Sequence, residues 1–169
     1  MTWASGSEYV VNTHGHADHT CGNRAVLSKT GAELLVHEAD APEILRGLNR
    51  AFTFVMGKRP SPAAHRTVTD GECIPIGQTG LTVIHTPGHT PGSICLFGEG
   101  NLFTGDTLFV GAVGRTDLKG GSLEVLLDSL KNLLRLPVDT TVWPGHDYGD
   151  APTSTLAREK ETNPYITDL

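Results

Sequence analysis

The chain has 169 residues, 38% of them hydrophobic and 19% charged, with a formal net charge of −6 at neutral pH. This length suits one domain with its own hydrophobic core, so we expect a single domain over residues 1–169. The negative charge argues against a nucleic-acid partner, and the sequence shows neither an apolar run of about 20 residues nor a targeting segment, which predicts a cytoplasmic protein with no membrane partner.

The first third of the chain predicts alternating strands and helices. A short β-branched run ends in a polar, glycine-containing segment, as a strand does when it leads into a functional loop. Helix caps, a proline in a first turn and glycine stops indicate the elements that follow. In chain order we expect a strand at Glu8–Asn12, a helix capped by Asn23 to about Lys29, a strand at Glu33–His37, and a helix capped by Asp40 to about Arg50.

The rest of the chain predicts an antiparallel meander followed by helices. Short β-type runs are separated by Gly, Asp or Pro turns, and leucines then recur at helical spacing after Ser122. Together these mixed elements predict a layered α/β or α+β domain. The meander strands are Thr67–Val68, Cys73–Ile76, Leu81–His85, Ser93–Leu96 and Leu102–Phe103, and the later elements are a helix from Ser122 to Leu134, a strand at Thr140–Trp143 and a short helix at Thr155–Thr162.

A compact group of metal-ligand side chains follows the first strand. His14, His16, Asp18 and His19 fall within six positions, and we expect them on an irregular loop that points several of them at one centre. Imidazole and carboxylate are the groups that zinc and ferrous iron prefer. A closed structural zinc site normally uses a cysteine-rich set of four ligands, which this segment lacks. The cluster therefore predicts a catalytic metal site.

Three later segments share one design, in which a strand ends at a glycine-containing turn that carries one further ligand type. They supply His89, Asp106 and His146. A carboxylate has two oxygens, so Asp106 is suited to bridge two ions. The seven residues together suffice for a binuclear centre.

The remaining histidines and the cysteines have simpler interpretations. A lone histidine is more often an ordinary core or surface residue than a ligand. Three cysteines without paired spacing predict reduced thiols, and we expect the one beside the metal cluster to be a small packed thiol rather than a nucleophile. These residues are His37, His65, His85, Cys21, Cys73 and Cys95.

The motifs resemble the metallo-β-lactamase superfamily. The resemblance rests on H-x-H-x-D-H at 14–19, T-P-G-H-T-P-G at 86–92, F-T-G-D-T-L-F at 103–109 and P-G-H-D-Y at 144–148. Within the superfamily the chain is similar to single-domain glyoxalase II-like hydrolases and to persulfide dioxygenases. The resemblance implies a four-layer αββα sandwich of helices outside two β-sheets, with metals at one edge.

By position, the resemblance assigns His14, His16 and His89 to a first metal, Asp18, His19 and His146 to a second, and Asp106 to both. Family members carry several strands before the first histidine motif, which begins here at residue 14. Part of the N-terminal sheet is therefore expected to be lacking. A truncated chain, a misassigned start codon and an unusual homo-oligomer are three explanations that the sequence leaves open.

Two chemistries fit this ligand list. A glyoxalase II-like hydrolase would use two zinc ions, or iron or manganese, and a metal-bound hydroxide oriented by Asp18 to cleave a thioester of the hydroxyacylglutathione type. A persulfide dioxygenase would need only His14, His89 and Asp106 around one Fe(II). The loops divide between them: Asp147-Tyr148 and Arg115-Thr116-Asp117 resemble the dioxygenases, whereas the segment 105–109 and the helix entry at 120–122 resemble the hydrolases. We interpret the chain as a hydrolase. A metal-binding protein without turnover is the third class.

The predicted substrate is a small thiol-derived molecule. Arg115 is the candidate partner for a substrate carboxylate, because a guanidinium matches that planar group. A purely structural pairing of Arg115 with Asp117 is an equal alternative. Tyr148, directly after the last motif histidine and its aspartate, is a second candidate substrate contact.

Overall fold

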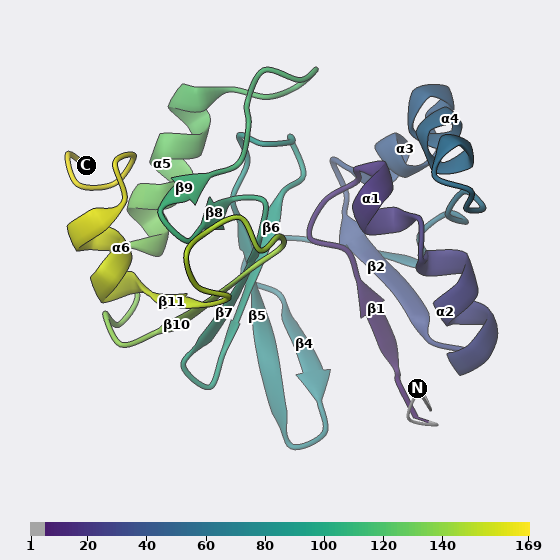
Figure 1. Ribbon diagram of the computed structural model, residues 1–169. Coiled ribbons are helices and arrows are strands. Elements are labelled where there is room, and N and C mark those ends of the chain that lie inside the picture. The colour runs from purple at the N-terminus through teal and green to yellow at the C-terminus, as the bar shows by residue number, and fades with distance from the viewer. Residues whose placement is uncertain (1–5) are drawn as a thin grey trace. The chain divides into compact units, whose positions relative to one another are not determined.

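The computed structural model describes residues 6–169, and its contacts divide the chain into an N-terminal unit up to Val68 and a C-terminal unit from Thr69. Figure 1 shows their elements. Each unit carries its own sheet. The expectation of a single domain stays a prediction.

The N-terminal unit contains a three-stranded parallel sheet in the order β1-β2-β3. Its central strand is almost wholly buried, as a central parallel strand should be, and it reads as the continuous apolar run Leu-Leu-Val. The unit's elements are β1 (Tyr9–Val11), α1 (Ala17–Thr20), α2 (Asn23–Thr30), β2 (Glu33–His37), α3 (Ala41–Ile44), α4 (Gly47–Val55) and β3 (Arg66–Val68).

Four expectations for this unit were wrong in detail, among them the cap of α2, which is Gly22 rather than Asn23. The ligand segment is not wholly irregular, because Ala17–Thr20 forms the short helix α1. The helix predicted from Asp40 to Arg50 is two helices, α3 and α4, separated at Leu45 and Arg46. The run at Thr67–Val68 belongs to β3, which pairs in parallel with β2 rather than opening the antiparallel meander.

The C-terminal unit is built on a six-stranded mixed sheet in the order β11-β10-β7-β6-β5-β4. The predicted meander is confirmed for β4 to β7, whose neighbours pair antiparallel. The strand β10 then pairs in parallel with β7. The strands are β4 (Cys73–Ile76), β5 (Thr79–His85), β6 (Ile94–Gly98), β7 (Asn101–Gly105), β10 (Thr141–Pro144) and β11 (Ser154–Thr155).

Helix α5 (Leu123–Leu133) covers this sheet. Ser122 caps it as predicted, since its hydroxyl accepts the Val125 amide. The leucines at helical spacing form one apolar stripe that packs on the sheet. The resulting core contains Leu126, Leu130 and Leu133 of the helix with Cys95, Leu102, Leu108, Val142, Leu156 and Ile166.

A small hairpin and a C-terminal helix complete the unit. The hairpin pairs β8 (Leu108–Phe109) with β9 (Ala112–Val113). The helix is α6 (Leu156–Thr162), whose cap Thr155 accepts the Arg158 amide. The side chain of Glu159 on α6 is fully buried and accepts the Gly111 amide at the hairpin turn. The hairpin was not predicted, because two-residue strands carry little periodicity.

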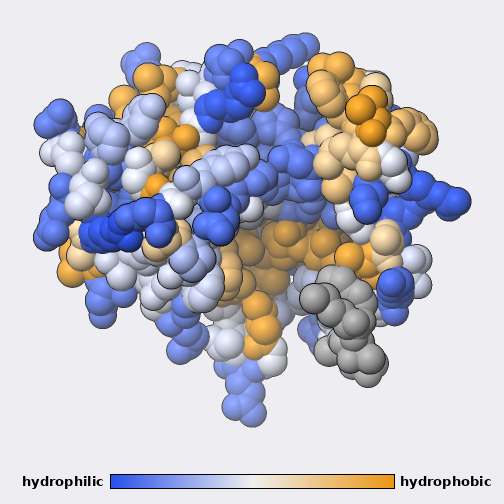
Figure 2. All heavy atoms as spheres, in the orientation of Figure 1, coloured by the Kyte–Doolittle hydropathy of each residue, from blue (hydrophilic) through white to orange (hydrophobic). Residues whose placement is uncertain are grey.

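The surface of the N-terminal unit includes an exposed apolar face on α4. Leu48, Phe52 and Val55 are 71%, 57% and 84% exposed and recur at helical spacing. Figure 2 shows this face within the orange region at the upper right. Among the described residues, no helix is long and apolar enough to cross a membrane.

Candidate metal centre

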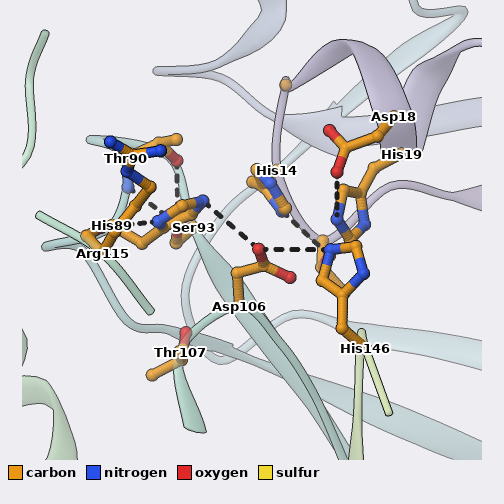
Figure 3. Close-up of polar contacts among 12 residues, drawn as sticks. His14, Asp18, His19, His89, Thr90, Ser93, Asp106, Thr107, Arg115 and His146 are labelled. Atoms are coloured by element: carbon orange, nitrogen blue, oxygen red, sulfur yellow. Dashed lines mark hydrogen bonds and ion pairs between the residues drawn. The ribbon is translucent and has the colours of Figure 1, made fainter. Parts of the chain in front are cut away.

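The C-terminal unit gathers three predicted ligands at one edge of its sheet. His89, Asp106 and His146 follow β5, β7 and β10 respectively. These three strands run in the same direction, because β5 and β7 are both antiparallel to β6 and β10 is parallel to β7. Their carboxyl ends therefore meet, and the three side chains converge (Figure 3).

Asp106 lies between the two imidazoles. Its Oδ2 is 3.6 Å from His89 Nε2 and 3.5 Å from His146 Nε2. Two ligand atoms held tetrahedrally about 2.0–2.1 Å from one zinc ion lie about 3.4 Å apart. The observed separations are too long for good hydrogen bonds and match those of ligands that share an ion. The donor set in this unit therefore fits a metal.

The His89 ring is held in the orientation that a metal ligand needs. Its Nδ1–H donates to the Arg115 carbonyl oxygen at 2.7 Å, which leaves Nε2 directed at Asp106. Metal-ligating histidines typically donate their second ring nitrogen in this way. This backbone partner could not be identified from the sequence, since a carbonyl carries no residue signature.

Gly145 brings two ligand turns close together. A Cβ on this residue would lie 2.7 Å from Asp106 Oδ1 and 3.0 Å from the Gly105 carbonyl. The Gly145 amide also donates to the Gly105 carbonyl at 2.8 Å. The glycine of the Pro-Gly-His motif is thus required by close approach of the backbone to the Asp106 turn.

The N-terminal unit carries the other four predicted ligands after β1. The rings of His14 and His19 have centroids 4.1 Å apart, and those of His14 and His16 are 4.8 Å apart. His19 Nε2 lies 3.6 Å from Asp18 Oδ2, again the spacing of two ligands on one ion (Figure 3). This half of the predicted set is therefore also assembled.

Asn12 and Asn23 stabilise this ligand segment. Asn12 Nδ2 donates to the His19 carbonyl at 3.1 Å, and Asn23 Nδ2 donates to Asn12 Oδ1 at 2.7 Å. Asn23 was predicted as a helix cap, but Gly22 holds that position and the Asn23 side chain also reaches Ser61 Oγ at 2.9 Å. The sequence shows polar residues here but not their mutual contacts.

The two candidate substrate residues have structural partners. The Arg115 guanidinium makes a bidentate pair with Asp117 at 2.7 Å for both bonds, and this pair holds the pKa of the Asp117 carboxyl down at about 2. The Tyr148 ring is 70% exposed and stacks on His146, with centroids 4.8 Å apart and planes 5° apart. Their roles in substrate binding stay predictions.

The residues given simpler interpretations make ordinary contacts. His65 Nδ1 accepts the Leu34 amide, and His85 Nε2 donates to the Pro91 carbonyl. The three cysteines are free thiols, as predicted. Burial raises the pKa of Cys95 to about 11, despite hydrogen bonds with Thr86 and Thr107 that act the other way. That thiol stays protonated near neutral pH.

Comparison with known protein families identifies the superfamily. The model of the metallo-beta-lactamase superfamily matches residues 8–146, which include all seven predicted ligands. The chain belongs to this superfamily. This confirms the predicted α/β metallo-β-lactamase sandwich, and proteins of this fold bind metal ions.

Two curated relatives carry different activities in their names. A hydroxyacylglutathione hydrolase of Rhodospirillum rubrum is 39% identical over 142 residues, which cover 83% of this chain and 48% of the relative. The human mitochondrial persulfide dioxygenase ETHE1 is 32% identical over 162 residues, covering 94% of this chain and 56% of the relative. This chain thus spans about half the length of each.

A solved structure agrees with the fold of this metallo-beta-lactamase superfamily member. TTHA1623 in a di-iron-bound form superposes with a TM-score of 0.80 at 32% identity, covering 94% of this chain and 77% of that one. The identities of this chain to the named hydrolase and to the named dioxygenase are similar, at 39% and 32%.

Proposed function

We propose that this metallo-beta-lactamase superfamily member is a metal-dependent hydrolase of the glyoxalase II type, which cleaves a thioester of a hydroxyacylated small thiol. The observation that carries the proposal is the position of Asp106 Oδ2, within 3.6 Å of His89 Nε2 and 3.5 Å of His146 Nε2. A carboxylate between two imidazoles is suited to join two metal sites. The hydroxyacylglutathione hydrolase relative supports the same reaction class.

The proposed centre holds two zinc ions, or iron or manganese, per chain. The di-iron-bound state of the similar structure supports a pair of ions. The first site takes His14, His16 and His89, the second takes Asp18, His19 and His146, and Asp106 contributes to both.

In this proposal the protein's side chains position the attacking water and the substrate, and none of them acts as a covalent nucleophile. The metals, when bound, lower the pKa of a water toward neutrality and polarise the thioester carbonyl. Asp18 is half exposed, with 48% of its side chain accessible, so its carboxylate can accept a hydrogen bond from the attacking water. A thiolate is a good leaving group, so a strong general acid is not needed. The thiol of Cys95, buried with a raised pKa, takes no part.

Arg115 and Tyr148 are proposed to contact the substrate. Both side chains are largely exposed, at 61% for Arg115, and each lies beside a ligand: the Arg115 carbonyl accepts from His89, and Tyr148 stacks on His146. A substrate carboxylate would compete with Asp117 for the Arg115 guanidinium. The proposed partner is a small molecule, and we propose a cytoplasmic protein without a nucleic-acid or membrane partner. A size measurement in solution would test whether the chain forms a homo-oligomer.

A second candidate is a mononuclear iron persulfide dioxygenase. It is favoured by the match to ETHE1 across 94% of this chain. His14, His89 and Asp106 would hold the iron, with the other four ligand types unused for metal. Thioester hydrolysis and oxygen uptake separate the two reactions.

The direct test uses Asp106→Ala beside the wild-type chain. The purified proteins are assayed with a glutathione thioester and, separately, with glutathione persulfide in an oxygen electrode. We expect thioester cleavage by the wild type, loss of at least about 100-fold in Asp106→Ala with parallel loss of metal, and no oxygen uptake. Asp128→Ala, at an exposed carboxylate on α5, is the matched control and should be unchanged. Full metal content in Asp106→Ala would contradict the bridging role, and a wild type that consumes oxygen without cleaving thioester would contradict the hydrolase.

A further inference from the structure

The backbone of Gly15, between the ligand types His14 and His16, is held from both sides. Its amide donates to Asp40 Oδ2 at 2.7 Å, a length typical of a charge-assisted hydrogen bond. Its carbonyl accepts from Asn49 Nδ2 at 2.9 Å. Both contacts are buried, and Asp40 and Asn49 are 1% and 8% exposed.

These two bonds restrict the geometry of the ligand pair. The Gly15 amide belongs to the peptide that joins it to His14, and the Gly15 carbonyl belongs to the peptide that joins it to His16. Peptide groups are planar, so the backbone between two of them has only two soft dihedral angles. Fixing both planes therefore fixes the two dihedral angles of Gly15, and with them the relative positions of the His14 and His16 Cα atoms.

The space around Gly15 shows that the fit is tight. A Cβ on Gly15 would lie 3.1 Å from the Glu43 Cβ and 3.3 Å from both Asp40 Oδ2 and the Asp40 carbonyl. Asp40 stands at the predicted cap of α3, yet its side chain makes no cap hydrogen bond there. A residue type that ordinarily stabilises a helix start instead supports the ligand segment.

We propose that Asp40 and Asn49 are positioning residues, which clamp Gly15 so that His14 and His16 meet one metal ion in a preformed geometry. The proposal rests on the proposed function only for the metal ion that His14 and His16 would bind. Its contacts lie wholly within the N-terminal unit. Groups outside the ligand set commonly tune metal affinity by about 10- to 100-fold.

The test compares Asp40→Ala and Asn49→Ala with Thr53→Val. Thr53 is a matched control because it lies one turn after Asn49 on α4 and is 1% exposed, and its hydroxyl donates to the Asn49 carbonyl at 2.9 Å rather than to the ligand segment. Hydrogen exchange of the Gly15 amide is followed by NMR in the metal-free proteins, and zinc affinity is measured by competition with a chelating dye. Asp40→Asn keeps an acceptor oxygen and is the conservative variant.

We expect Asp40→Ala to speed Gly15 exchange by about 10- to 100-fold and both alanine variants to weaken zinc binding by about 10- to 100-fold. Thr53→Val should change neither, and Asp40→Asn should recover most of the affinity. Should Asp40→Ala fail to fold, a smaller rise in Gly15 exchange in Asp40→Asn carries the test, since a neutral bond is weaker.

The clamp would be overturned if the Gly15 amide exchanged in Asp40→Ala at the wild-type rate. If only Asp40→Asn folds, an unchanged Gly15 exchange rate in that variant would overturn it. Equal loss of zinc affinity in Thr53→Val would overturn the positioning role, since general weakening of α4 would then explain the effect. A wild type that binds no zinc would remove the proposed function. The exchange comparison would still support or overturn the clamp itself.

Discussion

Glu159→Ala is expected to cost much of the stability of the C-terminal unit. The carboxylate is fully buried on α6 and accepts the Gly111 amide at 2.9 Å and Asn163 Nδ2 at 2.8 Å, together with the Ser154 hydroxyl. A hydrogen bond to a charged group contributes about 1.5–3 kcal/mol, so losing the two N–H bonds costs about 4 kcal/mol. Domain stabilities are about 5–15 kcal/mol, which makes this a severe change.

The assay is urea denaturation followed by circular dichroism. The matched control is Glu161→Ala, which removes an exposed glutamate two residues later on the same helix and should change the free energy of unfolding by less than about 0.5 kcal/mol. Glu159→Gln keeps one acceptor oxygen and should fall between the two. A loss below about 1 kcal/mol in Glu159→Ala would refute the reasoning, because it would show that the buried donors find other partners at little cost.

Three further predictions concern a metal-ligand turn and the thiols. Gly145→Ala should weaken zinc affinity by at least about 10-fold, because the added Cβ would lie against Asp106. The control Gly47→Ala, whose Cβ would meet open space, should leave zinc affinity unchanged. Equal zinc affinities of the two variants would contradict the close approach at Gly145. At pH 8 a thiol reagent should label the exposed Cys73 quickly and Cys95 only after unfolding, and rapid labelling of Cys95 in the folded chain would contradict its burial. Since folding raises the Cys95 pKa from 9.0 to about 11, the unfolded thiol ionises first, and stability should fall as pH rises from about 9 to 11.

Much of the fold follows from local sequence signals. The strand at Glu33–His37 and the capped helix after Ser122 carry strong periodicity or a clear cap, and both lie where they were predicted. The parallel pairing of β3 with β2 could not be predicted, because the sequence of a three-residue strand does not indicate which strand it pairs with. The break between α3 and α4 was missed for a similar reason: propensity alone does not mark a turn at Leu45 and Arg46.

The candidate site divides in the same way. Ligand types were found from the sequence because each follows a strand at a short motif, and strand direction then brings His89, Asp106 and His146 together. The groups that hold those ligands were missed. The Arg115 carbonyl is backbone, and Asp40 lies 25 residues from the Gly15 amide that it accepts. Such contacts depend on tertiary structure, which local patterns do not encode.

The most direct test of the binuclear hydrolase is the metal content of the purified wild-type chain, measured by mass spectrometry on the same sample that is assayed for thioester cleavage and oxygen uptake. We expect two metal ions per chain, with thioester cleavage and no oxygen consumption. One iron per chain with oxygen consumed in the presence of glutathione persulfide would contradict it.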